Sequence, residues 1–356
     1  MSLVGPIKII GCGLIGTSLA LRLKEEGLAL ILADTSARNL QLASDLLECK
    51  EVAEKPSVII IATPPEYVHE VAMAEFTLHP EAIFIDVCGV KSKLMHKVAS
   101  FPELSRNYVS VHPMAGREIS GPESARSDLF KSRAWLVTKT ENSTDEAVAT
   151  ARELGALMES TIYEMDAVTH DSVIAAISHL PQILSSALGA SLNGVDVESL
   201  NLAGQGLRDV SRLADSDPEL WGSLLIANSG EILPKISEVI NRLSNLAEAL
   251  ERDDENSVRV FLTEGREGKN RIPGKHGLAK RDYTYLPIVI DDKPGGLARI
   301  FNECAEIKVN IEDLSMEHSP GQAVGLVSLA LSSDDAARLQ KHLVAKGWLA
   351  HAPKKD

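Results

Sequence analysis

The chain has 356 residues and a formal net charge of −14 at pH 7. At about 100–200 residues per domain, this length predicts two or three domains. Hydrophobic residues make up 44% and charged residues 24% of the chain, which excludes disordered and collagen-like classes. The excess of negative charge would repel a phosphate backbone, so no nucleic-acid partner is expected.

The four cysteines, Cys12, Cys49, Cys88 and Cys304, form neither a C-x-x-C pair nor any ligand-like spacing. Neither a disulfide framework nor a metal site is therefore predicted, and a reducing cytoplasm is the expected location. Glycines interrupt the apolar stretch at residues 9–21, which argues against a secretion signal. No uncharged apolar run reaches the ~18 residues that span a bilayer, so no membrane insertion is expected.

The N-terminal part of the chain alternates short apolar runs with amphipathic segments. The apolar runs lie at residues 7–10, 29–33, 58–62, 82–87, 108–111 and 135–138. Continuous apolar strands separated by helical patterns are typical of a parallel sheet that is covered on both faces. A doubly wound α/β domain is predicted over residues 1–165.

Strand signals are then absent for more than a hundred residues. Long helices are predicted at residues 167–192 and 224–252, which makes residues 166–264 an all-α domain. Within the first helix, Pro181 removes the hydrogen bond to the carbonyl of Ile177 and should kink the helix there.

A polar stretch at residues 265–282 carries six basic residues in a chain that is otherwise acidic. It lacks the interleaved aromatic residues that would stack on bases, so we interpret it as a basic linker rather than a nucleic-acid arm. The remaining segment, residues 283–356, is predicted to contain a strand, a helix, two strands, a helix and a final strand. This order is the ferredoxin-like α+β plan.

A glycine-rich turn directly follows the first predicted strand and reads Gly11-Cys12-Gly13-Leu14-Ile15-Gly16. In this G-x-G-x-x-G pattern, Gly11 permits the tight turn, Gly13 lets the backbone approach a pyrophosphate, and Gly16 lets the helix pack closely on the strand. The helix that opens with Leu14 and Ile15 directs its N-terminus at the anion. The pattern predicts a dinucleotide-binding loop.

Asp34 ends the second predicted strand, 18 residues after the last glycine of the loop. This is near the ~20 residues expected for the acid that binds the adenosine ribose hydroxyls. Its carboxylate would repel a 2′-phosphate, so NAD is expected in preference to NADP, although Arg38 follows closely. Thr63 and Pro64 come after the third strand and should form a second cofactor loop at the same edge of the sheet.

His112 ends the strand predicted at residues 108–111, where it should point into the cofactor crevice. Neutral imidazole, with an unperturbed pKa of about 6.5, can accept the hydroxyl proton that a hydride donor loses. A catalytic base and a loop histidine that caps backbone groups are both open interpretations.

Arg208 and Arg212 lie at i and i+4 and therefore on one face of a predicted helix. One interpretation is a bidentate clamp for substrate carboxylates. The other is a solvated face on which Asp209 and Asp215 relieve the like charges.

His170 and His179 lie nine residues apart in one predicted helix. From a straight helix they would point in opposite directions, which counts against a metal pair. The kink expected at Pro181 would be able to aim His179 into the interdomain crevice.

Taken together, these motifs resemble the prephenate and arogenate dehydrogenases of tyrosine biosynthesis, followed by an ACT-type regulatory domain. The resemblance covers nearly the whole chain and rests, beyond the glycine pattern, on His-Pro-Met-Ala-Gly at 112–116, Ser-His-Leu-Pro at 178–181, Arg-Asp-Val-Ser-Arg at 208–212, Ser-Asp-Pro at 216–218 with Trp221, and, for the ACT segment, residues 292–297 and 309–311. It implies a Rossmann-type NAD-binding domain, a helical substrate and dimerisation domain, and a homodimer.

The resemblance also implies NAD-dependent oxidative decarboxylation of prephenate to 4-hydroxyphenylpyruvate, with His112 taking up the proton of the 4-hydroxyl group. By the same resemblance Arg212 holds a substrate carboxylate, Arg208 assists, and His179 lines the pocket. Glu118 matches a position near the substrate side chain and would favour the ammonium group of arogenate. An arogenate (cyclohexadienyl) dehydrogenase is therefore an alternative.

One position departs from the family pattern. Where the family commonly has Gly-Ser-Val-Lys, this chain has Cys88-Gly89-Val90-Lys91, so glycine replaces the serine that usually orients the histidine and the substrate. We expect Ser92, Cys88 or a water molecule to supply that hydrogen bond, although Cys88 is more typical of a packing residue.

The ACT resemblance implies that tyrosine or another aromatic end product binds near Gly295 and Gly296 and inhibits. Two other functions share parts of this pattern. Hydroxyacid dehydrogenases use a lysine on the interdomain helix, but no lysine occurs between Lys139 and Lys235. A non-catalytic sensor that couples NAD to amino-acid binding would not need His112.

Overall fold

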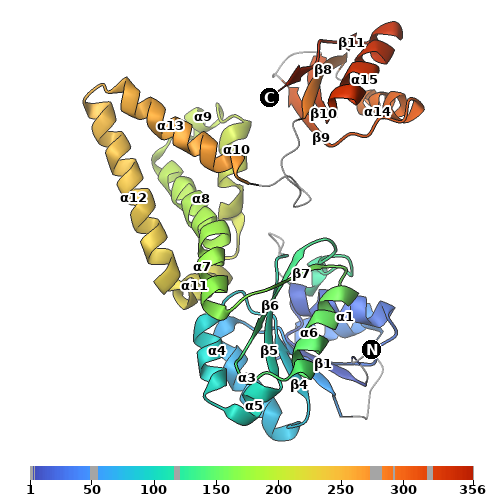
Figure 1. Cartoon of the computed structure of the whole chain (residues 1–356), viewed down its shortest axis with the longest axis vertical. Coiled ribbons are helices and arrows are strands. Elements are labelled where there is room, and N and C mark those ends of the chain that lie inside the picture. The colour runs from blue at the N-terminus through green and yellow to red at the C-terminus, as the bar shows by residue number, and fades with distance from the viewer. Residues whose placement is uncertain are drawn as a thin grey trace. The chain divides into compact units, whose positions relative to one another are not determined.

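The computed structural model describes residues 3, 5–48, 55–115, 121–272, 283–291, 293–318 and 324–355. The chain forms two compact units, Met1–Asn245 and Leu246–Asp356. The elements of both are labelled in Figure 1, and each unit is described by itself.

A seven-stranded sheet occupies the N-terminal part of the first unit, with the strand order β2-β1-β3-β4-β5-β6-β7. Its strands are β1 (Ile7–Ile10), β2 (Leu30–Ala33), β3 (Val58–Ile61), β4 (Ile83–Asp86), β5 (Tyr108–Pro113), β6 (Ala134–Lys139) and β7 (Thr161–Glu164). Strands β1 to β5 are parallel. The predicted doubly wound α/β domain is confirmed.

Helices cover both faces of this sheet (Figure 1). They are α1 (Leu14–Glu25), α2 (Ala37–Leu47), α3 (Pro65–Leu78), α4 (Ser92–Ala99), α5 (Pro102–Arg106) and α6 (Asp145–Leu157). Every residue of β3 is buried: Val58 and Ile60 pack with α1, α2 and α6, whereas Ile59 and Ile61 pack with α3, α4 and α5. Each such side chain contributes about 1.5–3 kcal/mol, which explains why an unbroken apolar run forms a central strand.

The prediction of a parallel sheet is wrong at β6 and β7, because β6 runs antiparallel to β5 and β7 runs parallel to β6. Between these strands, the only helix in the residues that the structure describes is the short 3-10 turn η1 (Pro122–Ser124). A parallel connection needs a crossover, usually an α-helix, to carry the chain back across the sheet. Without one, the chain returns in the opposite direction.

The rest of the first unit is helical, as predicted. Its elements are α7 (Ala167–Ile174), the π-helical turn η2 (Ala175–His179), α8 (Leu180–Ser191), η3 (Leu192–Gly194), α9 (Val197–Leu200), α10 (Gln205–Ser211), η4 (Arg212–Asp215), α11 (Pro218–Ala227) and α12 (Ser229–Glu251), which ends just beyond this unit. The single helix expected at 224–252 is wrong, because α11 ends before Asn228 and α12 begins after it. The side chain of Asn228 is buried and binds inward to α7 and η2.

One helical rod, Ala167–Gly194, is long and apolar enough to cross a membrane by length and composition. It carries the buried polar side chains of His170, Asp171 and His179. A helix in the core of a folded domain passes the same test, so this is weak evidence for a membrane span.

The second unit contains α13 (Glu255–Asn270) and an antiparallel sheet of order β11-β8-β10-β9. The strands are β8 (Thr284–Asp291), β9 (Asp313–His318), β10 (Val324–Leu331) and β11 (Leu349–Ala350), with β12 (Lys354–Lys355) also paired to β8, and the helices are α14 (Gly296–Glu306) and α15 (Ser333–Ala345). The first and second strands both pair antiparallel with the third. This is the predicted ferredoxin-like arrangement.

The expected linker begins later than residue 265, because α13 continues to Asn270. Gly265 and Gly268 each cost this helix about 1 kcal/mol relative to alanine. The helix is capped at its start by Asp254, whose carboxylate accepts the N–H of Ser257 at 3.1 Å. The glycines therefore do not mark the end of α13. Residues 273–282 of the expected linker lie outside the described part of the chain.

Candidate functional site

The glycine-rich loop joins β1 to α1 at the carboxyl edge of the parallel strands. Gly11 has φ +102°, and a Cβ there would lie 2.4 Å from the carbonyl oxygen of Ala62. A Cβ on Gly16 would lie 1.9 Å from the carbonyl oxygen of Gly11. In contrast, no atom lies within 4 Å of a Cβ placed on Gly13, so open space faces the N-terminus of α1.

Strand β1 lies between β2 and β3, which makes this edge the point where the strand order reverses and where such sheets bind ligands. The loop after β3 lies beside the glycine-rich loop, because the N–H of Ala62 donates to the carbonyl of Ile10 at 2.7 Å. In this loop the hydroxyl of Thr63 is buried without a hydrogen-bond partner. A buried orphan hydroxyl indicates room for a polar ligand.

Asp34 accepts two backbone hydrogen bonds, from Cys12 at 2.6 Å and from Ser36 at 2.7 Å. Its carboxylate therefore braces the glycine-rich loop against the loop after β2. Arg38, which would favour a 2′-phosphate, instead donates to Glu123. Open space at a helix N-terminus, an orphan hydroxyl and a carboxylate after β2 together fit NAD.

His112, in β5, stands at the start of a hydrogen-bonded row. Its Nδ1 lies 3.0 Å from Nε2 of His170, and Nδ1 of His170 lies 2.8 Å from a carboxylate oxygen of Asp171. The same carboxylate accepts the backbone N–H groups of Lys91 and Ser92, at 2.8 and 2.7 Å. The row thus ties β5 to α7 and to the start of α4.

His179 lies in the same buried cluster as His170, which a straight helix would not allow. The π-helical turn η2 ends at His179, shortly before Pro181. Because proline lacks an N–H, the bond to the carbonyl of Ile177 is missing, and the wider turn changes the phase of the helix. The predicted kink therefore takes the form of a π turn, which brings both histidines to one place.

The surroundings of His179 assign its proton. Nδ2 of Asn228 lies 3.1 Å from Nδ1 of His179 and also donates to the carbonyl of Asp171 at 2.9 Å. An amide nitrogen is a donor, so Nδ1 of His179 accepts and Nε2 carries the hydrogen. Burial lowers the pKa of His179 to about 4, and the ring packs edge-on against Trp221 with centroids 6.0 Å apart.

A fully buried lysine fixes the backbone beside His112. The ammonium of Lys91 donates to the carbonyls of Val111 at 2.7 Å and Cys88 at 2.5 Å, and to Asp86 at 3.3 Å. Tyr108 donates to the other carboxylate oxygen of Asp86 at 2.8 Å. The carbonyl that precedes His112 is thus held from inside the core.

Electrostatics keep His112 neutral. Burial, and then the positive charge of Lys91, hold the pKa of His112 well below its usual value, with smaller contributions from His170 and His179. Burial also lowers the pKa of His170, although Asp171 opposes this shift. A histidine that stays neutral at pH 7 can accept a proton.

Neither protein side chain expected to replace the family serine binds His112 in the hydrogen bonds of the described residues. The hydroxyl of Ser92 donates to the carbonyl of Ala167 at 3.0 Å. Its backbone N–H, at the N-terminus of α4, donates to Asp171. Burial raises the pKa of the Cys88 thiol to about 12, which suits packing. The side chain that shares a hydrogen bond with His112 is instead His170, at Nδ1 on the opposite side of the ring.

The arginine pair lies on a segment that is fastened to α8. Arg208, in α10, and Arg212, at the start of η4, are both exposed. The side chain of Gln182 binds the carbonyl of Leu213 at 2.7 Å, and Ser185 binds that of Val210 at 2.8 Å. The pair is thus anchored within one or two turns of His179, which lies in the same rod. Glu118 lies outside the described residues.

In the second unit, Gly295 and Gly296 lie at a pocket of about 320 Å³ between β8 and the start of α14. Gly295 has φ +86°, a conformation that favours glycine. Leu297 and Met316 are among the apolar residues that line the pocket, and Asp291 and Lys293 are charged ones.

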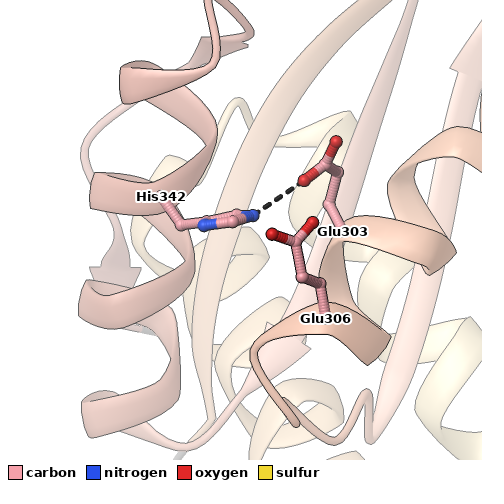
Figure 2. Close-up of side chains that lie close together, drawn as sticks. All are labelled: Glu303, Glu306 and His342. Atoms are coloured by element: carbon pink, nitrogen blue, oxygen red, sulfur yellow. Dashed lines mark hydrogen bonds and ion pairs between the residues drawn. The ribbon is translucent and has the colours of Figure 1, made fainter.

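Glu303, Glu306 and His342 also come together in this unit, with oxygen and nitrogen atoms close enough to hold a metal ion (Figure 2). Nε2 of His342 lies 2.7 Å from Glu303. The ammonium of Lys346, however, donates to Glu303 at 2.7 Å and also to Glu306. A lysine already neutralises these carboxylates, so the cluster is an ion-pair network between α14 and α15.

Sequence reasoning missed the partners of His112. Asp171 is a polar residue in the apolar helix α7, Asn228 lies between two apolar helices, and Lys91 follows an apolar strand and turn. A polar residue in an apolar stretch was therefore the available signal. The sequence suggests His170 only as one member of a metal pair, which the phase of a straight helix disfavours. What it binds depends on how α7 packs beside β5, which no local pattern encodes.

Comparison with known proteins places these observations in a family. Residues 19–164 match the family model described as prephenate dehydrogenase, nucleotide-binding domain, and residues 166–264 match prephenate dehydrogenase, dimerization domain. The chain is 28% identical over 357 residues to a probable prephenate dehydrogenase of Streptomyces niveus, covering 97% of this chain and 99% of the relative.

Two solved structures share the fold. Prephenate dehydrogenase from Aquifex aeolicus, in complex with hydroxyphenyl propionate and NAD+, has a TM-score of 0.68 at 24% identity and covers 75% of this chain and 97% of that one. Arogenate dehydrogenase from Synechocystis has a TM-score of 0.63 at 26% identity and covers 75% of this chain and 99% of that one. The chain belongs to the prephenate dehydrogenase family of NAD-dependent oxidoreductases.

Proposed function

We propose that the protein catalyses the NAD-dependent oxidative decarboxylation of prephenate to 4-hydroxyphenylpyruvate in tyrosine biosynthesis, with His112 as the catalytic base. The observation that carries this proposal is a neutral histidine at the carboxyl edge of a nucleotide-binding sheet, with Nδ1 engaged by His170. Nε2 is then the atom that faces the reaction.

When bound, NAD supplies the acceptor for the hydride that leaves the ring carbon bearing the hydroxyl group. His112 accepts the hydroxyl proton at Nε2 while the carbonyl forms. The carbon–carbon bond to the ring carboxylate then breaks, carbon dioxide leaves, and the released electron pair makes the ring aromatic. The resulting phenolate recovers a proton, so the products are 4-hydroxyphenylpyruvate, carbon dioxide and reduced cofactor.

The cofactor loops have distinct tasks in this proposal. Gly13 and the first N–H groups of α1 would hold the pyrophosphate, and Asp34 would accept hydrogen bonds from the adenosine ribose hydroxyls. The full set of expected cofactor contacts is Gly11, Gly13, Leu14, Ile15, Gly16, Asp34, Thr63 and Pro64. The open space at Gly13 and the orphan hydroxyl of Thr63 support it.

The substrate carries two carboxylates, which gives the arginine pair its purpose. Arg212 would hold one carboxylate in a bidentate manner and Arg208 would assist. His179 would offer the Nε2 hydrogen as a donor within the pocket. Glu118 would lie near the substrate side chain and would favour arogenate, for which the similarity to an arogenate dehydrogenase also speaks.

We further propose that the C-terminal segment is an ACT-type regulatory domain. Its ferredoxin-like topology and the pocket at Gly295 and Gly296 support binding of tyrosine or another aromatic amino acid there. A homodimer formed by the helical domain is consistent with large apolar side chains that this domain exposes, among them Ile177, Leu202 and Ile226.

A cytoplasmic location is part of the proposal. Cys88 and Cys304 are free thiols, and both are buried, as expected in a reducing compartment.

The test is a side-by-side assay of the purified protein with prephenate and arogenate, in the presence of NAD or NADP. We expect NAD-dependent formation of reduced cofactor with release of carbon dioxide, and 4-hydroxyphenylpyruvate as the product from prephenate. Tenfold faster turnover of arogenate at equal concentration would select the alternative substrate. No turnover of either would favour a non-catalytic sensor.

A further inference from the structure

We propose that His170 and Asp171 are positioning residues that hold the proton of His112 on Nδ1 and thereby keep its Nε2 free to act as the base. This inference rests on the proposed role of His112 as the catalytic base. It concerns how that role is built into the fold, and it assigns a purpose to a buried His-Asp pair that touches neither the glycine-rich loop nor the arginine segment in any described hydrogen bond.

The direction of each hydrogen bond follows from its last member. The carboxylate of Asp171 only accepts, so the nitrogen of His170 that lies 2.8 Å away must donate. Burial lowers the pKa of His170, so its ring is neutral and the other nitrogen, Nε2, can only accept. The partner of that nitrogen is Nδ1 of His112 at 3.0 Å, which must therefore donate.

Asp171 is itself held ionised and immobile. Its carboxylate accepts two backbone N–H groups, from Lys91 and Ser92, at the positive N-terminal end of α4. Burial alone would raise the pKa of Asp171, but hydrogen bonds from His170 and from these backbone groups keep it below its usual value. The acceptor at the end of the row therefore cannot rotate away or turn into a donor at neutral pH.

In the hydrogen bonds of the described residues, Nε2 on the opposite side of the His112 ring has no such partner. A Cβ on Gly89 would lie 3.6 Å from Nε2 of His112, so this glycine is the neighbour from which a side chain would reach that nitrogen. With glycine at this position, orientation of the ring must come from the Nδ1 side. His170 is completely buried and Asp171 nearly so, which makes this support rigid.

A merely structural His-Asp pair would stabilise the fold without setting the tautomer of His112. The two roles differ in what a shape-preserving variant does. His170→Phe keeps a ring of similar size but removes the acceptor, whereas His170→Gln keeps an acceptor near the position of Nε2. His96→Gln, on the exposed side of α4, is the matched control.

We expect His170→Phe to lower kcat by about 10²-fold, within the range of general-base catalysis. The KM for substrate and the Kd for NAD, measured by titration without turnover, should change less than threefold. The kcat of His170→Gln should be at least tenfold higher than that of His170→Phe. Asp171→Asn, which frees the tautomer of His170, should also lower kcat at least tenfold.

The tautomer is read directly from ¹⁵N NMR of the protein labelled in histidine, with the His112 signals identified by their loss in His112→Gln. We expect a protonated Nδ1 and an unprotonated Nε2 in the unmodified protein, and a mixture of both tautomers in His170→Phe. A proton on Nε2 in the unmodified protein would overturn the inference, as would unchanged kcat in a folded His170→Phe protein.

This outcome is separable from that of the proposed function. If His112→Gln retains activity, the base is another group and the proposed mechanism fails, whatever the tautomer. If His112→Gln is inactive but the tautomer of His112 is the same with and without His170, only the positioning role fails.

Discussion

At the scale of single residues, the site depends on keeping one imidazole neutral in a protein of strongly negative net charge. The charge that acts on His112 is local and positive, because Lys91 is buried beside it. Burial and this ammonium both favour the neutral ring. His170 and His179 lower the pKa of His112 further, whereas Asp171 and Asp86 oppose the lowering of the pKa of His170.

The pH dependence of activity follows with a definite sign. The base works only while neutral, so kcat/KM should stay level as the pH falls to 6.5 and should drop only at the lowered pKa of His112. Lys91→Met removes the nearby positive charge, which raises that pKa and moves the acid limb of the profile to higher pH. Lys97→Met, on the exposed side of α4, should leave it in place. An acid limb that does not move in Lys91→Met would refute this electrostatic role.

Gly89 offers a prediction in the opposite direction, towards higher activity. A serine Cβ there would lie 3.2 Å from a methyl carbon of Leu224 and 3.6 Å from Nε2 of His112. The methyl end can shift by a few tenths of an ångström, and the hydroxyl then comes within reach of the base. We expect Gly89→Ser to have equal or higher kcat. A large loss of turnover would show that the space beside Nε2 must remain empty.

At the scale of elements, the helix from α7 to α8 carries the least predictable feature. A proline in the sequence was enough to predict a kink, and the missing hydrogen bond explains its place. The form of the kink, a π turn that brings His170 and His179 into one cluster, depends on what the freed backbone meets in the folded state. Helical periodicity assumes a straight helix, so it placed His170 and His179 on opposite sides. In the structure they lie in one cluster.

The break between α11 and α12 was not predicted either, because an apolar pattern continues through it. Asn228 lies at this break, and its side chain binds both Asp171 and His179. Similarly, apolar runs located the strands of the sheet, but the reversed direction of β6 depends on its connection rather than on its own residues.

Asn228→Ala should therefore act on both stability and substrate binding. It leaves Nδ1 of His179 buried without a donor, which costs about 1–3 kcal/mol. We expect the urea midpoint of the N-terminal unit to fall and the KM for substrate to rise several-fold, because His179 becomes free to rotate. Asn201→Ala, at an exposed position, is the control. An unchanged KM and an unchanged urea midpoint would mean that the hydrogen bond from Asn228 to His179 has no role.

At the scale of the whole molecule, length and element order predicted the succession of an α/β part, a helical part and a ferredoxin-like part. These are set by hydrophobic periodicity, which is local. The hydrogen-bonded row from His112 to Asp171 was beyond reach, because it joins residues 58 positions apart. The net charge of −14 argued against a nucleic-acid partner but masked the positive groups, Lys91 and the arginine pair, on which the proposed chemistry depends.

Regulation belongs to this scale, because the proposed effector pocket and the base lie in different units. We expect tyrosine to inhibit the full-length protein, and Gly295→Val to abolish inhibition, since a β-branched residue at φ +86° distorts the pocket wall. Turnover without tyrosine should not change. Gly347→Val, strained in the same way at φ +81° in the same unit, should remain inhibited. Equal inhibition of both variants would place the effector elsewhere.

The central claim is that His112 is the catalytic base, and the most direct test is the rate of reduced cofactor formation in a single turnover of His112→Ala with prephenate and NAD. We predict that this rate falls by about 10²–10⁴-fold while NAD binding and the urea midpoint stay close to those of the unmodified protein. A folded His112→Ala protein that turns over prephenate as fast as its parent would contradict the account.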